Sequence, residues 1–126
     1  MNTREPGTPP RVLVVEDNIP VSMLIETVLG DMGFTVVRPA THLTDTLEAA
    51  GSEALDAAIL DVKPNRKNAW QVALILRDRG IPFVFTTACG GEVAMPARLE
   101  TAPIMSKPFR VGDLEAWLRS VVPRTA

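Results

Sequence analysis

The sequence predicts an α/β protein in which a parallel β-sheet is covered by helices on both faces. Two observations lead to this doubly wound fold class. Short apolar runs without polar alternation recur along the chain, which is typical of strands that are buried on both faces. Segments with apolar residues at helical spacing separate these runs, and strands that alternate with helices form a parallel sheet with right-handed crossovers. The chain of 126 residues is long enough for one such domain.

The predicted elements follow one another in a regular order. Residues 11–15 (RVLVV) are the first strand. Apolar residues then recur at helical spacing over residues 21–32, with Pro20 in the first turn and Gly33 as the stop. Further strands are expected at residues 34–37, 57–60, 82–86 and 102–105, and further helices at residues 43–50, 69–79 and 114–121. Residues 92–100 are left open between helix and loop, because two glycines and a proline in or beside them disfavour a helix.

Composition and net charge limit the kinds of partner and the cellular location that we expect for this protein. A formal net charge of −2 and a pI near 5.4 give no reason to expect a nucleic-acid or membrane-surface partner. The chain has one cysteine, Cys89, which cannot form an internal disulfide, and it has no run long and apolar enough for a membrane span. We therefore expect a cytoplasmic protein. Residues 1–10, with three prolines, are expected to be a disordered leader, residues 11–122 the domain, and residues 123–126 a tail.

Polar side chains follow the predicted strands at their carboxyl ends, where ligands bind in open parallel sheets. These residues are Glu16 and Asp17 after the first strand, Asp61 after the third, Thr86 and Thr87 at the fourth, and Ser106 and Lys107 at the fifth. Carboxylates repel one another when they are brought together, so three of them at one edge predict a bound cation.

Metal-assisted phosphoryl transfer is the chemistry that needs such a set. Magnesium is usually held by one or two carboxylates plus a phosphate oxygen, and an aspartate can itself be the nucleophile that forms an aspartyl phosphate. Asp17 and Asp61 would hold Mg²⁺, with Glu16 nearby. Lys107 would pair with Asp61 and then with the phosphoryl group, and Thr87 would offer its hydroxyl to a phosphoryl oxygen.

Four segments carry a resemblance to a known family: VLVVEDN (12–18), AILDVKP (58–64), IPFVFTTA (81–88) and MSKPF (105–109). With these segments in this order, the chain resembles the receiver domain of bacterial two-component response regulators. The resemblance implies a flavodoxin-like (CheY-like) sheet of five strands in the order 2-1-3-4-5. It also implies phosphorylation of Asp61 by a sensor histidine kinase or a histidine phosphotransfer protein, and a Mg²⁺ ligand in the backbone carbonyl of Lys63. Such a protein is a phosphoacceptor that assists only its own phosphorylation and dephosphorylation.

The sequence departs from the family pattern in two places. The loop KPNRKNAW (63–70) lacks the acidic-glycine pair that many receivers carry after the phosphorylated aspartate, so we expect a loop of different shape. In receivers a threonine, here Thr87, moves toward the phosphoryl group and an aromatic residue on the fifth strand turns inward behind it. Ile104 stands at that aromatic position and cannot turn in this way, and Cys89 occupies the alternative aromatic position. The readout is therefore expected to be weak or to run through residues 90–96.

The lifetime of the phosphoryl group should depend on residues that flank the site. The small side chain of Ala88 leaves the site open to water, and Cys89 lies beside it. Lys63 either shields the acyl phosphate or points to solvent, and the sequence does not decide between the two.

Two other functions are consistent with these polar residues at the carboxyl ends of the strands. The first is a receiver-like binding module that works without phosphorylation, which the altered loop and the missing aromatic favour. The second is a magnesium-dependent phosphohydrolase, which is disfavoured because Lys63 stands where such enzymes present a second aspartate. We expect no output domain after the last predicted helix. We therefore expect a single-domain regulator, a monomer or weak homodimer, that acts through contacts with an unknown downstream protein.

Overall fold

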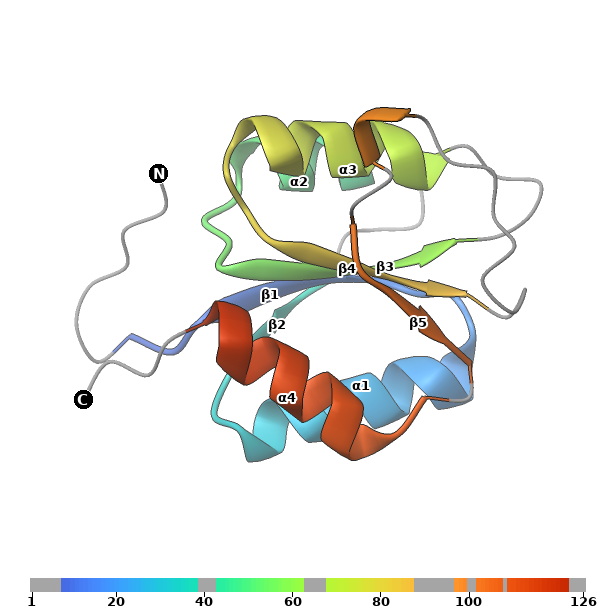
Figure 1. The fold of residues 1–126 in the computed structure, drawn as a ribbon. Coiled ribbons are helices and arrows are strands. Elements are labelled where there is room, and N and C mark those ends of the chain that lie inside the picture. The colour runs from blue at the N-terminus through green and yellow to red at the C-terminus, as the bar shows by residue number, and fades with distance from the viewer. Residues whose placement is uncertain are drawn as a thin grey trace.

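The fold is a five-stranded parallel sheet between two layers of helices (Figure 1). The computed structural model describes residues 8–38, 43–62, 68–87, 97–99, 102–107 and 109–122. The strands are β1 (Arg11–Val15), β2 (Thr35–Val37), β3 (Ala57–Val62), β4 (Phe83–Thr87) and β5 (Ile104–Ser106). Their order in the sheet is β2-β1-β3-β4-β5, and every neighbouring pair is parallel. The predicted fold class and strand order are confirmed.

Helices cover both faces of the sheet (Figure 1). One face carries α1 (Ile19–Asp31) and α4 (Val111–Val121), and the other carries α2 (Leu43–Ser52) and α3 (Asn68–Asp78). A short 3₁₀ helix, η1 (Ala97–Leu99), lies against α3. In the described part of the chain, no helix is both long enough and apolar enough to cross a bilayer.

Each face of the sheet has its own apolar core, and alternation along the strands assigns residues to one or the other. On β3, Leu60 and Val62 pack into the core under α2 and α3, whereas Ile59 packs into the core under α1 and α4. Asp61 lies between Leu60 and Val62 and therefore faces the α1 and α4 side. This alternation decides which side chains of the carboxyl edge can meet.

Helix α1 begins and ends where its sequence signals lie. The side chain of Asn18 accepts a hydrogen bond from the backbone N–H of Val21 at 3.1 Å, which caps the first turn, and a proline follows in that turn. Gly33, just beyond the helix, has a φ of 78°, a left-handed conformation that favours glycine. The start of α1 is therefore fixed directly beside the end of β1.

Four of the five strands differ from their predicted bounds, and β2, expected to begin at residue 34, begins at Thr35. β3 was expected to end at residue 60 but continues through Asp61 and Val62, because these residues pair with Thr86 and Thr87. For the same reason β4 lies one residue later than predicted, and β5 begins two residues later and ends one residue later. Where each strand ends depends on its pairing with a neighbouring strand, and the local sequence does not reveal that pairing.

The predicted leader is described only in its last three residues. Within them, the Pro10 carbonyl accepts a hydrogen bond from Thr35 N at 2.7 Å, so backbone pairing reaches one residue beyond the predicted domain boundary. Residues 1–7, the tail at 123–126 and most of the undecided segment at 92–100 lie outside the described residues.

Candidate functional site

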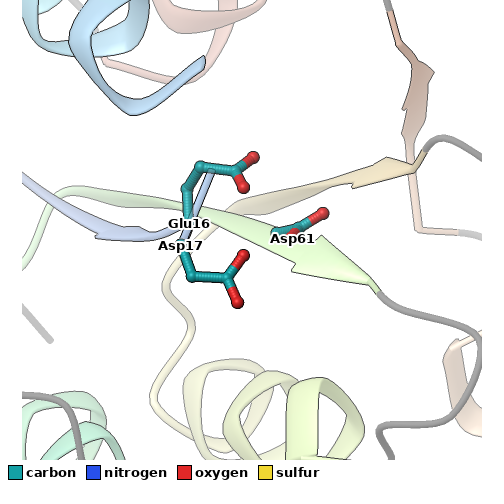
Figure 2. Close-up of side chains that lie close together, drawn as sticks. All are labelled: Glu16, Asp17 and Asp61. Atoms are coloured by element: carbon teal, nitrogen blue, oxygen red, sulfur yellow. The ribbon is translucent and has the colours of Figure 1, made fainter. Parts of the chain in front are cut away.

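Three carboxylates meet at the carboxyl edge of the sheet. Glu16 and Asp17 directly follow β1, and Asp61 is the penultimate residue of β3. Each contributes a carboxylate oxygen to a group in which all oxygens lie within 4.8 Å of one another. Figure 2 shows Glu16 and Asp17 pointing to opposite sides of the end of β1, with Asp61 beside them. We refer to these three residues as the carboxylate cluster.

Lys107 joins two members of the carboxylate cluster. Its Nζ lies 2.9 Å from Asp61 Oδ1 and 2.7 Å from Glu16 Oε1. The Glu16 side chain is 1% exposed, that of Asp61 6% and that of Lys107 17%, so these ion pairs lie mostly out of water. Buried charges require partners of this kind, because an unpaired carboxylate in such a place loses its hydration without compensation.

Asn18 holds the other oxygen of Glu16. Glu16 Oε2 accepts a hydrogen bond from the backbone N–H of Asn18 at 3.0 Å. The same residue caps α1, so the start of the helix and the orientation of Glu16 are fixed together. Asn18 had no role in the sequence analysis, although an asparagine two residues before Pro20 is the ordinary signal of a helix cap.

The environment shifts the pKa of two of these groups. Burial raises the pKa of Glu16, and the charge of Asp61 acts in the same direction, against the opposing effects of Lys107 and the Asn18 N–H. For Lys107, burial alone lowers the pKa, but hydrogen bonds to Glu16 and Asp61 and their charges outweigh it and raise the pKa above its ordinary value. Lys107 therefore remains an ammonium at neutral pH.

The donor set fits a hard divalent cation. One ammonium faces three carboxylates, and oxygen ligands at a sheet edge suit Mg²⁺, which is usually held by one or two carboxylates and keeps several waters. Glu16 already has contacts to Lys107 and Asn18 through its two oxygens. Asp17 and Asp61 are therefore the better placed direct ligands, with Glu16 behind them.

The two threonines of β4 lie on different faces of the sheet, and both are fully buried. Thr87 pairs with Val62 and so lies on the α2 and α3 face. Its carbonyl accepts a hydrogen bond from Lys107 N at 2.7 Å, which fixes the backbone of the lysine to the end of β4. Thr86 pairs with Asp61 and lies on the α1 and α4 face.

Two of the remaining predicted site residues lie on β5. Ile104, at the expected switch position, pairs with Phe85 and is 37% exposed. Ser106 pairs with Thr87 and is exposed. Lys63, Ala88 and Cys89 lie outside the described residues.

Comparison with known sequences finds relatives across most of the chain. No protein-family model matches the sequence. A probable transcriptional regulator of Guillardia theta is 31% identical over 121 residues, which are 94% of this chain and 47% of that protein. The response regulator MprA of Mycobacterium ulcerans is 31% identical over 119 residues, which are 91% of this chain and 51% of that protein. The chain thus spans about half the length of the curated relatives it matches.

Comparison with solved structures finds the same fold. The receiver domain of a sensor histidine kinase from Pseudomonas aeruginosa, which has a magnesium ion in its active-site cleft, superposes with a TM-score of 0.75 at 21% identity, covering 93% of this chain and all of that one. A CheY-like response regulator receiver domain from Methylobacillus flagellatus gives a TM-score of 0.72 at 21% identity, covering 90% of this chain and 99% of that one. SdrG of Sphingomonas melonis gives 0.70 at 29% identity, covering 90% and 97%.

Proposed function

This chain belongs to the CheY-like receiver domains of response regulators, and from that premise we propose that it accepts a phosphoryl group on Asp61. The donor is a phosphohistidine of a histidine kinase or of a histidine phosphotransfer protein, and the reaction requires Mg²⁺. The observation that carries the proposal is the contact of Lys107 with Asp61, 2.9 Å from Nζ to Oδ1, within the carboxylate cluster.

Asp61 acts as the nucleophile in this proposal. A carboxylate oxygen of Asp61 forms a bond to phosphorus while the phosphorus–nitrogen bond of the phosphohistidine breaks, and the electron pair of that bond remains with the imidazole. Lys107 already touches Asp61 Oδ1, so its ammonium is in place to balance charge on the phosphoryl oxygens. Thr87 is the last residue of β4 and lies on the α2 and α3 face, so the role that the family resemblance gives it, offering its hydroxyl to one of those oxygens, requires the phosphoryl group to lie beyond the end of β4.

Asp17 and Asp61 would hold the metal, together with the backbone carbonyl of Lys63 that the family resemblance implies. Bound Mg²⁺ supplies positive charge to the phosphoryl oxygens during transfer. Glu16 would lie behind these two ligands. Its Oε1 lies 2.7 Å from Lys107 Nζ and so holds the ammonium between Glu16 and Asp61.

The partner would dock on apolar residues next to the carboxylate cluster. Ile19 is 71% exposed and Met23 is 62% exposed, one turn apart on α1, and Ile19 is only two residues from Asp17. Large exposed apolar side chains of this kind favour contact with another protein. A histidine-bearing helix seated there would bring its phosphohistidine to Asp61.

The proposal extends to the output and to the lifetime of the phosphoryl group. We propose that this domain, monomeric or weakly dimeric, acts through protein–protein contacts with a downstream protein. Lys63, Ala88 and Cys89 are the residues proposed to set the lifetime. Lys63→Ala should change the rate at which phosphorylated Asp61 decays in a timed assay, and an unchanged rate would remove Lys63 from the mechanism.

The test is a phosphorylation assay that is read by intact mass. Wild-type protein is incubated with acetyl phosphate and Mg²⁺, beside Asp61→Asn and the control Asp31→Asn, which alters an exposed aspartate at the end of α1. We expect one phosphoryl group on the wild type and on Asp31→Asn, and none on Asp61→Asn. A folded wild type that takes no phosphoryl group would contradict the proposal and favour the alternative, a receiver-like binding module that works without phosphorylation.

A further inference from the structure

The hydroxyl of Thr86 is buried and has no partner in the described part of the chain. Thr86 is 0% exposed, and its Oγ1 makes no hydrogen bond to any of the described residues. Buried hydroxyls nearly always have a partner, because burial removes the hydrogen bonds that water would make. The Thr86 hydroxyl is therefore available to a partner that arrives in another state of the protein.

Thr86 lies on β4, the strand that the Lys107 side chain crosses to reach Asp61. In the sheet, β4 stands between β3 and β5. Lys107 leaves the end of β5 and reaches Asp61 on β3, so its side chain has to cross β4. The crossing is on the α1 and α4 side, because Met105, two residues before Lys107, packs into the core on that side.

The register places Thr86 on that same side and next to Asp61. Thr86 pairs with Asp61 on one neighbouring strand and with Met105 on the other. Val84, two residues earlier on β4, packs into the core under α1 and α4, which confirms the face. Thr86 thus lies next to Asp61 on the face of the sheet that the Lys107 side chain crosses, yet its hydroxyl bonds to neither residue in this state.

We propose that Thr86 is a positioning residue for Lys107 in the phosphorylated state, where its Oγ1 accepts a hydrogen bond from the Lys107 ammonium. This inference rests on the proposed function. An ammonium has three N–H donors, and here Nζ faces Glu16 Oε1 and Asp61 Oδ1. Phosphorylation turns the Asp61 carboxylate into an acyl phosphate, which weakens its hold on Nζ and draws the ammonium toward the phosphoryl oxygens. Thr86 then supplies a hydrogen-bond acceptor on β4 that holds the Lys107 ammonium in place.

Beryllofluoride tests this inference, because it adds to a carboxylate as a stable mimic of a phosphoryl group. Thr86→Val removes the hydroxyl and keeps the shape, Thr86→Ser keeps the hydroxyl, and Thr46→Val controls for a buried threonine on α2. Binding of beryllofluoride in Mg²⁺ is followed by fluorine NMR. We expect Thr86→Val to bind about fivefold more weakly, the effect of one ordinary hydrogen bond. Thr86→Ser and Thr46→Val should bind as the wild type does.

Unfolding in urea without Mg²⁺ separates positioning from structure. Because the hydroxyl bonds to none of the described residues in this state, Thr86→Val should be at least as stable as the wild type before beryllofluoride is added. Equal binding by Thr86→Val and wild type would overturn the inference and leave the proposed function intact. A Thr86→Val protein that is both less stable and weaker in binding would also overturn it, since the hydroxyl would then be structural. A wild type that does not bind beryllofluoride would overturn the proposed function and this inference together.

Discussion

Lys107 is the residue on which the charge balance of the carboxylate cluster depends. Its ammonium lies between Glu16 and Asp61, whose side chains are 1% and 6% exposed. Removing one member of a buried ion pair leaves the other charged and without hydration, which costs far more than the pair itself contributes. The side chain that we propose to act in phosphoryl transfer is thus also expected to stabilise the unliganded fold.

Lys107→Met should lower the free energy of unfolding in Mg²⁺-free buffer at neutral pH by about 3 kcal/mol, because Glu16 and Asp61 would lose their shared cation. The measurement is urea unfolding followed by circular dichroism. Arg119→Met, which removes an exposed cation of α4, is the control and should have little effect. An unchanged Lys107→Met protein would mean that the two carboxylates do not need this cation.

Asp17→Asn should have the opposite effect on stability. Asp17 adds a third negative charge within 4.8 Å of Glu16 and Asp61, and in a water-like dielectric one such repulsion costs about 1 kcal/mol. In Mg²⁺-free buffer the variant should therefore unfold at higher urea than the wild type. A decrease in stability would show that Asp17 makes a structural contact that outweighs the repulsion.

At the scale of elements, glycine marks two helix ends by its backbone conformation. Gly33 follows α1 with a φ of 78°, and Gly80 follows α3 with a φ of 74°. Side chains other than hydrogen are strained in this left-handed region. Gly30, within α1, has an ordinary helical conformation, and a methyl group added to its Cα would meet no neighbour within 4 Å. Glycine is therefore expected to stabilise the fold at position 33 and to destabilise it at position 30, relative to alanine.

The same substitution should therefore change stability in opposite directions along α1. Gly33→Ala should lower the free energy of unfolding by about 1 kcal/mol, because alanine is strained at positive φ. Gly30→Ala should raise it by about 0.5–1 kcal/mol, because alanine restricts the unfolded chain and suits a helix. Thermal unfolding of both variants checks the pair, and a decrease for both would contradict the assignment of Gly30 to an unstrained helical position.

The fold class could be predicted because it depends on hydrophobic periodicity and on general rules for connecting strands and helices, whereas the strand order was implied by the family resemblance. The run AILDV does not reveal where β3 ends, since Asp61 and Val62 belong to the strand only through their pairing with Thr86 and Thr87. The contact of Glu16 with Lys107 was not predicted, because two strands, β3 and β4, stand between β1 and β5 in the sheet. Spacing along the chain indicates which residues reach one edge, but not which of them touch.

At the scale of the whole molecule, the two edges of the sheet differ in how they contribute to stability. The amino edge is held by arginines: Arg11 bonds to Asp56 through its backbone N–H at 2.8 Å and to the Ala54 carbonyl through Nε at 2.8 Å. Arg79 donates to the carbonyls of Ala50 and Glu53, which ties the end of α3 to the end of α2. The carboxyl edge instead gathers like charges. The cores and the amino edge therefore offset the repulsion that remains at the carboxyl edge after Lys107 has paired with Glu16 and Asp61.

Bound Mg²⁺ should relieve the repulsion within the carboxylate cluster and stabilise the whole domain. A cation that binds the carboxylate cluster only in the folded state raises the free energy of unfolding by about 1.4 kcal/mol for each tenfold increase in Mg²⁺ above its dissociation constant. Urea midpoints measured across a MgCl₂ series, against NaCl of equal ionic strength, give this slope. Asp17→Asn should flatten it, because the variant lacks one of the two carboxylates proposed as direct ligands. An equal rise in NaCl would show that general screening, rather than a bound ion, relieves the repulsion among Glu16, Asp17 and Asp61.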